Sequence, residues 1–208
     1  MTTKKNVTLK KIIIALLGVW LVGIGIGFNN QAGLGNDAVA LFYDGVCRAL
    51  GYGVKELGMV SNGVNIVLAT FLLFVGRKYL NVGTLIYLLP YGLFVNFGTW
   101  LYSVVIIEPG FYLRVFCSVF GCLLLYFGVA VVISMDIGVD PLVGTVMVIK
   151  EFTGKDFRTV KILFDLALCV IGTVLGGTIG VVTIITAFSA GIGIQFFTEL
   201  LQKFYKRK

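Results

Sequence analysis

Long runs without a charged side chain constrain this chain more than any other feature. The longest, Leu166–Thr198, has 33 residues. Four further runs extend over Ile12–Phe28, Leu57–Gly76, Val82–Ile107 and Val115–Met135. A helix needs about 20 apolar residues to cross a bilayer, so runs of this length predict membrane-spanning helices. Ile12–Phe28 is longer than the usual core of a signal peptide, and we interpret it as the first span.

The longest run is too long for one span, and the glycine-rich stretch 176–180 predicts a turn inside it. We therefore expect a fifth span near Lys161–Leu175 and a sixth near Val181–Thr198. Hydrophobic residues make up 58% of the chain and charged residues 13%, against about 25% charged in soluble domains. This composition excludes a soluble fold. It favours a single membrane domain over residues 1–208, all-α and polytopic, with six transmembrane helices.

Two apolar segments, Leu34–Leu50 and Val139–Phe152, are shorter and carry charged residues. Each contains an aspartate that can cap the N-terminus of its helix: Asp37 in the first case, and Asp140 followed by Pro141 in the second. We interpret both as half-length helices, re-entrant or lying at the membrane interface.

The positions of the basic residues indicate the orientation. The net charge is +7, but lysine and arginine occur in short clusters between the apolar runs, which is typical of topology signals and not of a nucleic-acid-binding face. With six spans, all basic residues except Arg48, Lys55 and Arg114 lie on the cytoplasmic side with both termini. A model with eight spans, in which both short helices cross and only Arg77 and Lys78 lie outside, stays open.

The chain also shows an internal duplication, with repeat 1 at about 12–105 and repeat 2 at about 115–202. At an offset of 103 residues, matching pairs include Gly18 with Gly121, Gly25 with Gly128, Gly35 with Gly138 and Asp37 with Asp140. Later pairs, such as Thr84 with Thr183, match at an offset of 99. Three spans per repeat is an odd number, so the second repeat enters the membrane in inverted orientation, as in many transporters.

Two motifs carry a family resemblance. They are GLGND at Gly33–Asp37 and DIGVDP at Asp136–Pro141, each followed by a short helix that ends near a glycine. With these motifs the chain resembles the YczE/YyaS/YitT family of bacterial membrane proteins. It is most similar to the YczE-like branch, which lacks the soluble C-terminal domain of the longer YitT-like members. The resemblance implies a multi-pass protein of the bacterial cytoplasmic membrane, and it implies no substrate.

Asp37 and Asp140 are the leading candidates for a substrate or ion site. They occupy equivalent positions in the two repeats, and an ionisable group at membrane depth is a functional hypothesis by default. The alternative is that both only cap helices. Since Pro141 already fixes the start of the second helix, we expect Asp140→Asn to be more damaging than Asp37→Asn.

Amide side chains complete the candidate set. Asn36 precedes Asp37, and Asn29 and Asn30 end the first span, where they can line a cavity or an interfacial helix end. Three more lie inside spans: Asn62, Asn96 and Gln195. These either line a pathway or form hydrogen bonds between helices. Asn62 matches Asp165, which we expect to form a local ion pair with Lys161 near the cytoplasmic end of its span.

These features predict a transporter of a small polar or amphiphilic solute, with or without a coupled ion. Its site would lie between the repeats. The alternative is an accessory membrane protein that binds or stabilises another membrane complex. The chain has no histidine, no CxxC among its four cysteines and no nucleophile or nucleotide motif, so we expect neither an enzyme nor a metal or cofactor. The expected partners are lipid, the solute and, through small residues on span surfaces, a second copy of the chain.

Overall fold

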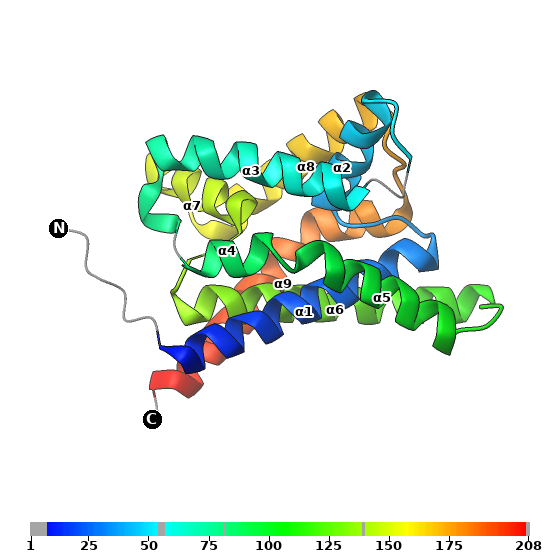
Figure 1. The fold of residues 1–208 in the computed structure, drawn as a ribbon, viewed down its shortest axis with the longest axis horizontal. Helices are drawn as coiled ribbons and strands as arrows, with labels where there is room; N and C mark the ends of the chain where they lie inside the picture. The colour runs from blue at the N-terminus through cyan, green and yellow to red at the C-terminus, as the bar shows by residue number, and fades with distance from the viewer. Residues whose placement is uncertain (1–7, 54–56, 81, 139, 207–208) are drawn as a thin grey trace.

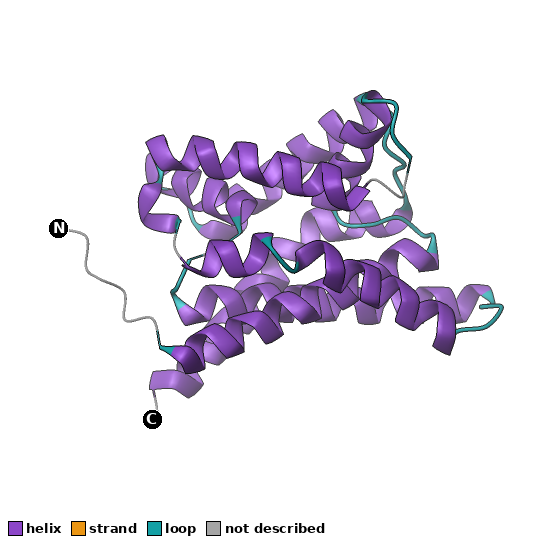
Figure 2. Cartoon of the chain, viewed as in Figure 1, coloured by secondary structure: helices purple, strands orange, loops and turns teal. Residues whose placement is uncertain are grey.

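The computed structural model describes residues 8–53, 57–80, 82–138 and 140–206. Within these ranges all regular structure is helical (Figure 2). The helices are α1 (Leu9–Ala32), α2 (Ala38–Ala49), α3 (Leu57–Val75), α4 (Val82–Leu88), α5 (Tyr91–Val105), α6 (Phe111–Met135), α7 (Pro141–Thr153), α8 (Phe157–Val174) and α9 (Val181–Lys206). A short 3₁₀ turn, η2 (Arg77–Tyr79), follows α3.

The helices pack in two layers (Figure 1). Helices α1, α5, α6 and α9 form one layer, in which α1 packs on both α5 and α6. The other layer contains α2, α3, α7 and α8, with α2 against α8 and α3 against α7. Helix α8 also packs on α9 and thereby joins the layers. Both ends of the chain lie at the same end of the bundle (Figure 1).

Three helices are long and apolar enough to cross a membrane: α1, α6 and the Val181–Lys203 part of α9. A shorter apolar helix extends over Met59–Val75. Helix α8 has 18 residues but carries Arg158, Lys161 and Asp165. The remaining expected span, Val82–Ile107, is not one helix, because Leu89 and Pro90 separate α4 from α5. Proline lacks the N–H that would continue the helix and its ring crowds the preceding turn, so a new helix begins after Pro90.

Glycines allow α1 and α6 to cross closely. A side chain at Gly25 would meet the backbone oxygen of Gly121, and one at Gly18 would meet the backbone oxygen of Gly128. Small residues at such crossings allow backbones to approach, which is a common way to pack helices in lipid. The crossing fixes the relative position of α1 and α6, the two long apolar helices. Helix α1 precedes the short helix α2, and α6 precedes the short helix α7.

The two short helices form where the sequence predicts them, and both aspartate caps are confirmed. Asp37 is the N-cap of α2 and Asp140 the N-cap of α7. The chain turns back after α1, α2 begins near the middle of the bundle, and α2 ends at the end where α1 ended (Figure 1). There Arg48 donates to the hydroxyl of Thr178 at 3.0 Å. Helix α7 ends at the opposite end of the bundle, where Lys78 and Glu151 form an ion pair at 2.5 Å.

The backbone shows matching features near the two short helices. The carbonyl of Leu34, before α2, accepts from the N–H of Val182 at 3.0 Å, and the carbonyl of Ile137, before α7, accepts from the N–H of Gly83 at 2.8 Å. Left-handed residues also occur in three pairs 103 residues apart. They are Gly33 and Asp136 (φ 64° and 52°), Gly35 and Gly138 (102° and 118°), and Gly51 and Gly154 (76° and 67°).

Candidate functional site

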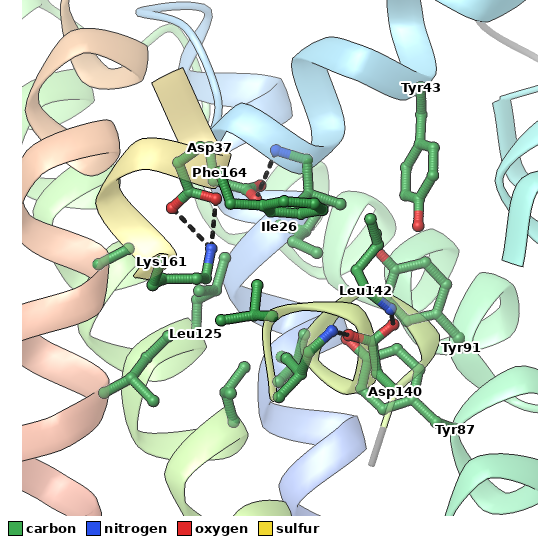
Figure 3. Close-up of a pocket in the computed structure, with 18 residues that line it drawn as sticks. Ile26, Asp37, Tyr43, Tyr87, Tyr91, Leu125, Asp140, Leu142, Lys161 and Phe164 are labelled. Atoms are coloured by element: carbon green, nitrogen blue, oxygen red, sulfur yellow. Dashed lines mark hydrogen bonds and ion pairs between the residues drawn. The ribbon is translucent and has the colours of Figure 1, made fainter. Parts of the chain in front are cut away.

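Two adjoining regions of free space lie between the layers. We call the first the central chamber; it has a free volume of about 50 Å³ and contains Asp37, Asp140, Lys161 and Asp165 in its wall (Figure 3). We call the second the vestibule; it has a volume of about 760 Å³ and opens at the end of the bundle that holds Gly33 and Thr178. Ile26, Tyr43 and Tyr91 line both spaces, so these side chains separate them.

Asp37 is buried, with 8% of its surface exposed. Its Oδ2 accepts from the N–H of Val39 at 3.2 Å, which caps α2. Its Oδ1 has no hydrogen-bond partner among the described residues. The preceding Asn36 fixes the turn, because its N–H donates to the hydroxyl of Thr183 at 3.2 Å and its Oδ1 accepts from the N–H of Asp37 at 2.9 Å. The capping geometry thus leaves one carboxylate oxygen of Asp37 available in the chamber wall.

Asp140 is buried to a similar degree, at 6% exposed, but its carboxylate is fully used. Its Oδ1 accepts from the N–H of Leu142 at 3.3 Å and its Oδ2 from the N–H of Val143 at 2.9 Å. A carboxylate at a helix N-terminus gains from both bonds and from the positive end of the helix dipole. The hydrogen bonds of Asp140 therefore fit a structural role in starting α7.

Lys161 and Asp165 form a buried ion pair on α8. The Nζ of Lys161 donates to both carboxylate oxygens, with 2.6 Å to Oδ2. The sequence predicts this ion pair, and the structure shows in addition that it is buried. The two residues are 7% and 1% exposed and lie in the chamber wall, where α8 packs on α2 and α9. Three aspartates and one lysine line the chamber, so acidic groups outnumber basic ones by two.

Three tyrosines form another part of the chamber wall. Tyr87 and Tyr91 lie on either side of the break at Pro90, and their rings stack with centroids 5.1 Å apart. The hydroxyl of Tyr43 donates to Oδ1 of the buried Asn65 at 2.9 Å. Figure 3 shows the three tyrosines and Asp140 on one side of the chamber, with Asp37 and Lys161 on the other.

The amides predicted from the sequence divide into two groups. Asn29, Asn30, Asn36 and Asn96 line the vestibule. Asn29 and Asn30 do so from the last turn of α1, which ends at Ala32. Asn62 and Gln195 line neither space. The structure thus brings four amides together at the vestibule and leaves two apart.

Sequence reasoning missed the tyrosines and did not include Lys161 and Asp165 among the site residues. The sequence does contain a signal that Lys161 and Asp165 belong to the site. Asp165 matches Asn62 at the offset of 103, and two charged residues inside a span are costly. Tyr87 and Tyr91 lie well inside an apolar run, away from the interface where tyrosine usually concentrates. Among the residues in the described ranges, no three of the side chains His, Cys, Asp and Glu form a group that can hold a metal ion.

In the described residues the bundle is helical, three of its helices are long and apolar enough to cross a membrane, and many large hydrophobic side chains are exposed on its surface. These features are typical of an α-helical membrane protein. The chain belongs to the family described as "Family of unknown function (DUF6198)", whose profile matches residues 9–199. It is 27% identical over 120 residues to the Bacillus subtilis protein described as "Uncharacterized membrane protein YczE", which confirms the resemblance to YczE. That match covers 58% of this chain and 54% of YczE.

A second relative comes from Haemophilus influenzae and is described as an uncharacterized protein. It is 25% identical over 195 residues, which cover 93% of this chain and 86% of the relative. No solved structure matches the chain. The comparisons therefore support a membrane protein whose similarity to relatives extends over nearly its whole length, and they assign no activity.

Proposed function

We propose that the protein is a transporter of a small polar or amphiphilic solute, built from two inverted three-span repeats with the site between them. The single observation that carries this proposal is the central chamber. Its charged residues lie between the layers, and the vestibule adjoins it from one end of the bundle, with Ile26, Tyr43 and Tyr91 between the two spaces. Buried ionisable groups are costly in a membrane protein and mark solute or ion pathways.

The glycine contacts between α1 and α6 support the inverted repeats. Gly18 lies against Gly128, and Gly25 lies against Gly121. At the offset of 103, Gly121 is the equivalent of Gly18 and Gly128 the equivalent of Gly25. Each residue therefore contacts the equivalent of the other, which is the reciprocal pattern that a two-fold axis produces. The contacts also run in opposite directions along the two helices, as inverted repeats require.

The backbone bonds near the short helices support the same axis. Leu34 and Ile137 are equivalent at an offset of 103, and Gly83 and Val182 at an offset of 99. Each carbonyl accepts from the N–H at the start of the third span of the other repeat. In each bond the carbonyl belongs to the offset of 103 and the N–H to the offset of 99. Two bonds that match in this way, on both sides of the four-residue deletion, are hard to obtain by chance.

The proposed topology has six spans: α1, α3, α4 with α5, α6, α8 and α9. Helices α2 and α7 are re-entrant from opposite faces. Lys78, Lys150 and the two termini lie at one end of the bundle, which is the cytoplasmic end by the distribution of positive charge. The vestibule then opens on the outer face of the cytoplasmic membrane. An accessory protein that only binds another complex needs neither a vestibule nor a charged chamber, so transport is the better-supported function.

Alternating access gives the test. In a variant without native cysteines, Val95→Cys in the vestibule wall should react with a membrane-impermeant maleimide from the outside. Its equivalent at the offset of 99 is Ile194, which is 2% exposed and lies in the chamber wall. A transporter that also adopts an inward-open state should expose Ile194→Cys to the same reagent from the cytoplasmic side, as measured in inside-out vesicles.

Gly63→Cys on the lipid-facing side of α3 serves as a control for reactivity that does not depend on a water-filled pathway, because nothing packs against this position. If Ile194→Cys stays unreactive from both sides while Val95→Cys reacts, the protein has a fixed vestibule and no transport cycle. That result would favour the accessory role.

A further inference from the structure

We infer that the central chamber binds a small organic cation, with an ammonium or guanidinium group held between Asp37 and the three tyrosines, in exchange for a proton. The inference rests on the proposed function and names the substrate class of the same site. It begins from Oδ1 of Asp37, a buried carboxylate oxygen without a partner among the described residues.

Asp37 has no direct ion-pair partner among the described residues. The charge of Lys161, the basic residue in the chamber wall, acts on it only from a distance, because the Nζ of Lys161 is bonded to both oxygens of Asp165. A buried carboxylate without a counter-charge is strongly unfavourable, so Asp37 carries either a proton or a cation. The titratable groups that line the chamber with it are Tyr43 on α2, Tyr87 on α4, Tyr91 on α5, Asp140 at the start of α7, and Lys161 and Asp165 on α8. Cys122 and Tyr126 on α6 and Cys169 on α8 lie outside the chamber wall, within electrostatic range of Asp37.

The tyrosines make the site suitable for an organic cation. Aromatic rings attract cations through their faces, and several aromatic side chains around one site are a common way to bind substituted ammonium groups. In Figure 3, Tyr43, Tyr87 and Tyr91 lie opposite Asp37 across the chamber. A cation between them would contact a carboxylate on one side and aromatic groups on the other.

The rest of the wall argues against a metal ion. Hard cations need six or more oxygen ligands, but the oxygens of Asp140 are used by backbone N–H groups, and the chamber residues form no metal-binding group in the described ranges. Most of the remaining wall is aliphatic, with Val22, Val129 and Val146 among its members. An apolar wall with few polar groups fits the hydrocarbon part of an organic ligand. The free volume of about 50 Å³ limits the ligand to a few heavy atoms, as in guanidinium or methylammonium.

The exchange is balanced in atoms and charge. Without a cation, the carboxyl of Asp37 is protonated. When the cation binds, the O–H bond of Asp37 breaks, the proton leaves to water in the vestibule, and the carboxylate pairs with the cation. One cation enters for each proton released, so the charge of the chamber stays constant. A proton gradient across the membrane can therefore drive movement of the cation.

Calorimetry on purified protein in lipid nanodiscs tests this directly, with guanidinium and methylammonium as probes and sodium as the control ion. We expect both organic cations to bind, with about one proton released per cation when heats are compared in buffers of different ionisation enthalpy. Asp37→Asn should weaken binding at least tenfold and abolish proton release. It keeps an N-cap acceptor, so α2 still forms.

Asp156→Asn is the matched control, since Asp156 is also a helix N-cap but is exposed and lies outside both spaces. It should bind like the wild type. Two variants of Tyr91 test whether its ring or its hydroxyl contributes to binding. Tyr91→Phe keeps the ring and should retain binding, whereas Tyr91→Leu removes the ring and should weaken binding severalfold. Melting temperatures report whether each variant is folded.

Four results would overturn the inference: unchanged binding in Asp37→Asn, equal binding of sodium, no binding of any organic cation to the wild type, or proton uptake and release without a cation. The last would mean a proton site only. In all of these cases reactivity of Ile194→Cys from the cytoplasmic side would still support transport of another solute. Cation binding with an unreactive Ile194→Cys would instead contradict transport while leaving the site in place.

Discussion

The N-termini of α2 and α7 occupy matching positions in the two proposed repeats, and yet their capping aspartates differ. Asp140 uses both oxygens on backbone N–H groups, whereas Asp37 uses one and leaves the other without a partner in the described part of the chain. Left-handed residues occur at matching positions before both aspartates, but Asn36 ties only the turn before Asp37 to Thr183. In the proposed repeats, matching turns thus hold one acid for structure and leave the other for chemistry.

The comparison of Asp37 with Asp140 depends first on the close crossing of α1 and α6, which brings the two halves of the chain together. Gly25→Leu should cause the largest effect, because the added side chain would meet the backbone of Gly121 and separate α1 from α6. We expect a loss of at least about 3 kcal/mol, the upper end for overpacking, seen as a large fall in melting temperature or in the yield of monodisperse protein. Gly128→Leu, at the equivalent position, should behave alike.

Gly63→Leu provides the control for the glycine substitutions, since nothing lies within 4 Å of a side chain built at that position. It should leave the melting temperature nearly unchanged or raise it slightly, because leucine has a higher helix propensity than glycine. Tolerance of leucine at Gly25 would show that α1 and α6 do not cross in this way.

The ion pair on α8 should have an effect of similar size. Lys161→Met leaves Asp165 buried without a partner and should cost about 3–5 kcal/mol of stability, measured by thermal unfolding in detergent. The double variant Lys161→Met/Asp165→Leu removes both charges and should recover most of the loss. A single variant as stable as the wild type would mean that water reaches this pair, and the pair would then not be buried.

The two caps themselves should differ by a smaller amount. Asp140→Asn replaces one of two used acceptors by an amide N–H₂ and should cost about 1 kcal/mol of stability. Asp37→Asn keeps the single bond from Val39 and loses no other, so its melting temperature without ligand should equal or exceed that of the wild type. Equal losses in both variants would remove the distinction between the two acids.

Much of this arrangement can be predicted from the sequence. The apolar runs predict the long helices, and Asp37 and Asp140 predict where the short helices begin, because the signals for both are local. The break at Pro90 has a local cause in the proline itself. The uncharged run Val82–Ile107 continues on both sides of it, however, and so predicts a single span. Proline is also tolerated within membrane spans, so its presence alone does not decide between a kink and a break.

The chamber is harder to predict, because it depends on packing between distant segments. Pro141 makes Asp140 the stronger candidate from the sequence alone, whereas the hydrogen bonds favour Asp37. Which oxygen of an aspartate lacks a partner is set by the turn that Asn36 makes with Thr183, 147 residues away. Lys161 and Asp165 predict an ion pair by their spacing, but only the packing of α8 against α2 and α9 shows that it is buried.

The central claim is that the two halves are inverted, and the residues after the short helices test it most directly. Tyr52 and Lys155 are equivalent at the offset of 103 and both are exposed. In a variant without native cysteines, an impermeant maleimide should label Tyr52→Cys only from outside the cell. The same reagent should label Lys155→Cys only from the cytoplasmic side. Labelling of both from the cytoplasmic side would contradict the account, because it would mean that α2 and α7 cross the membrane as two of eight spans.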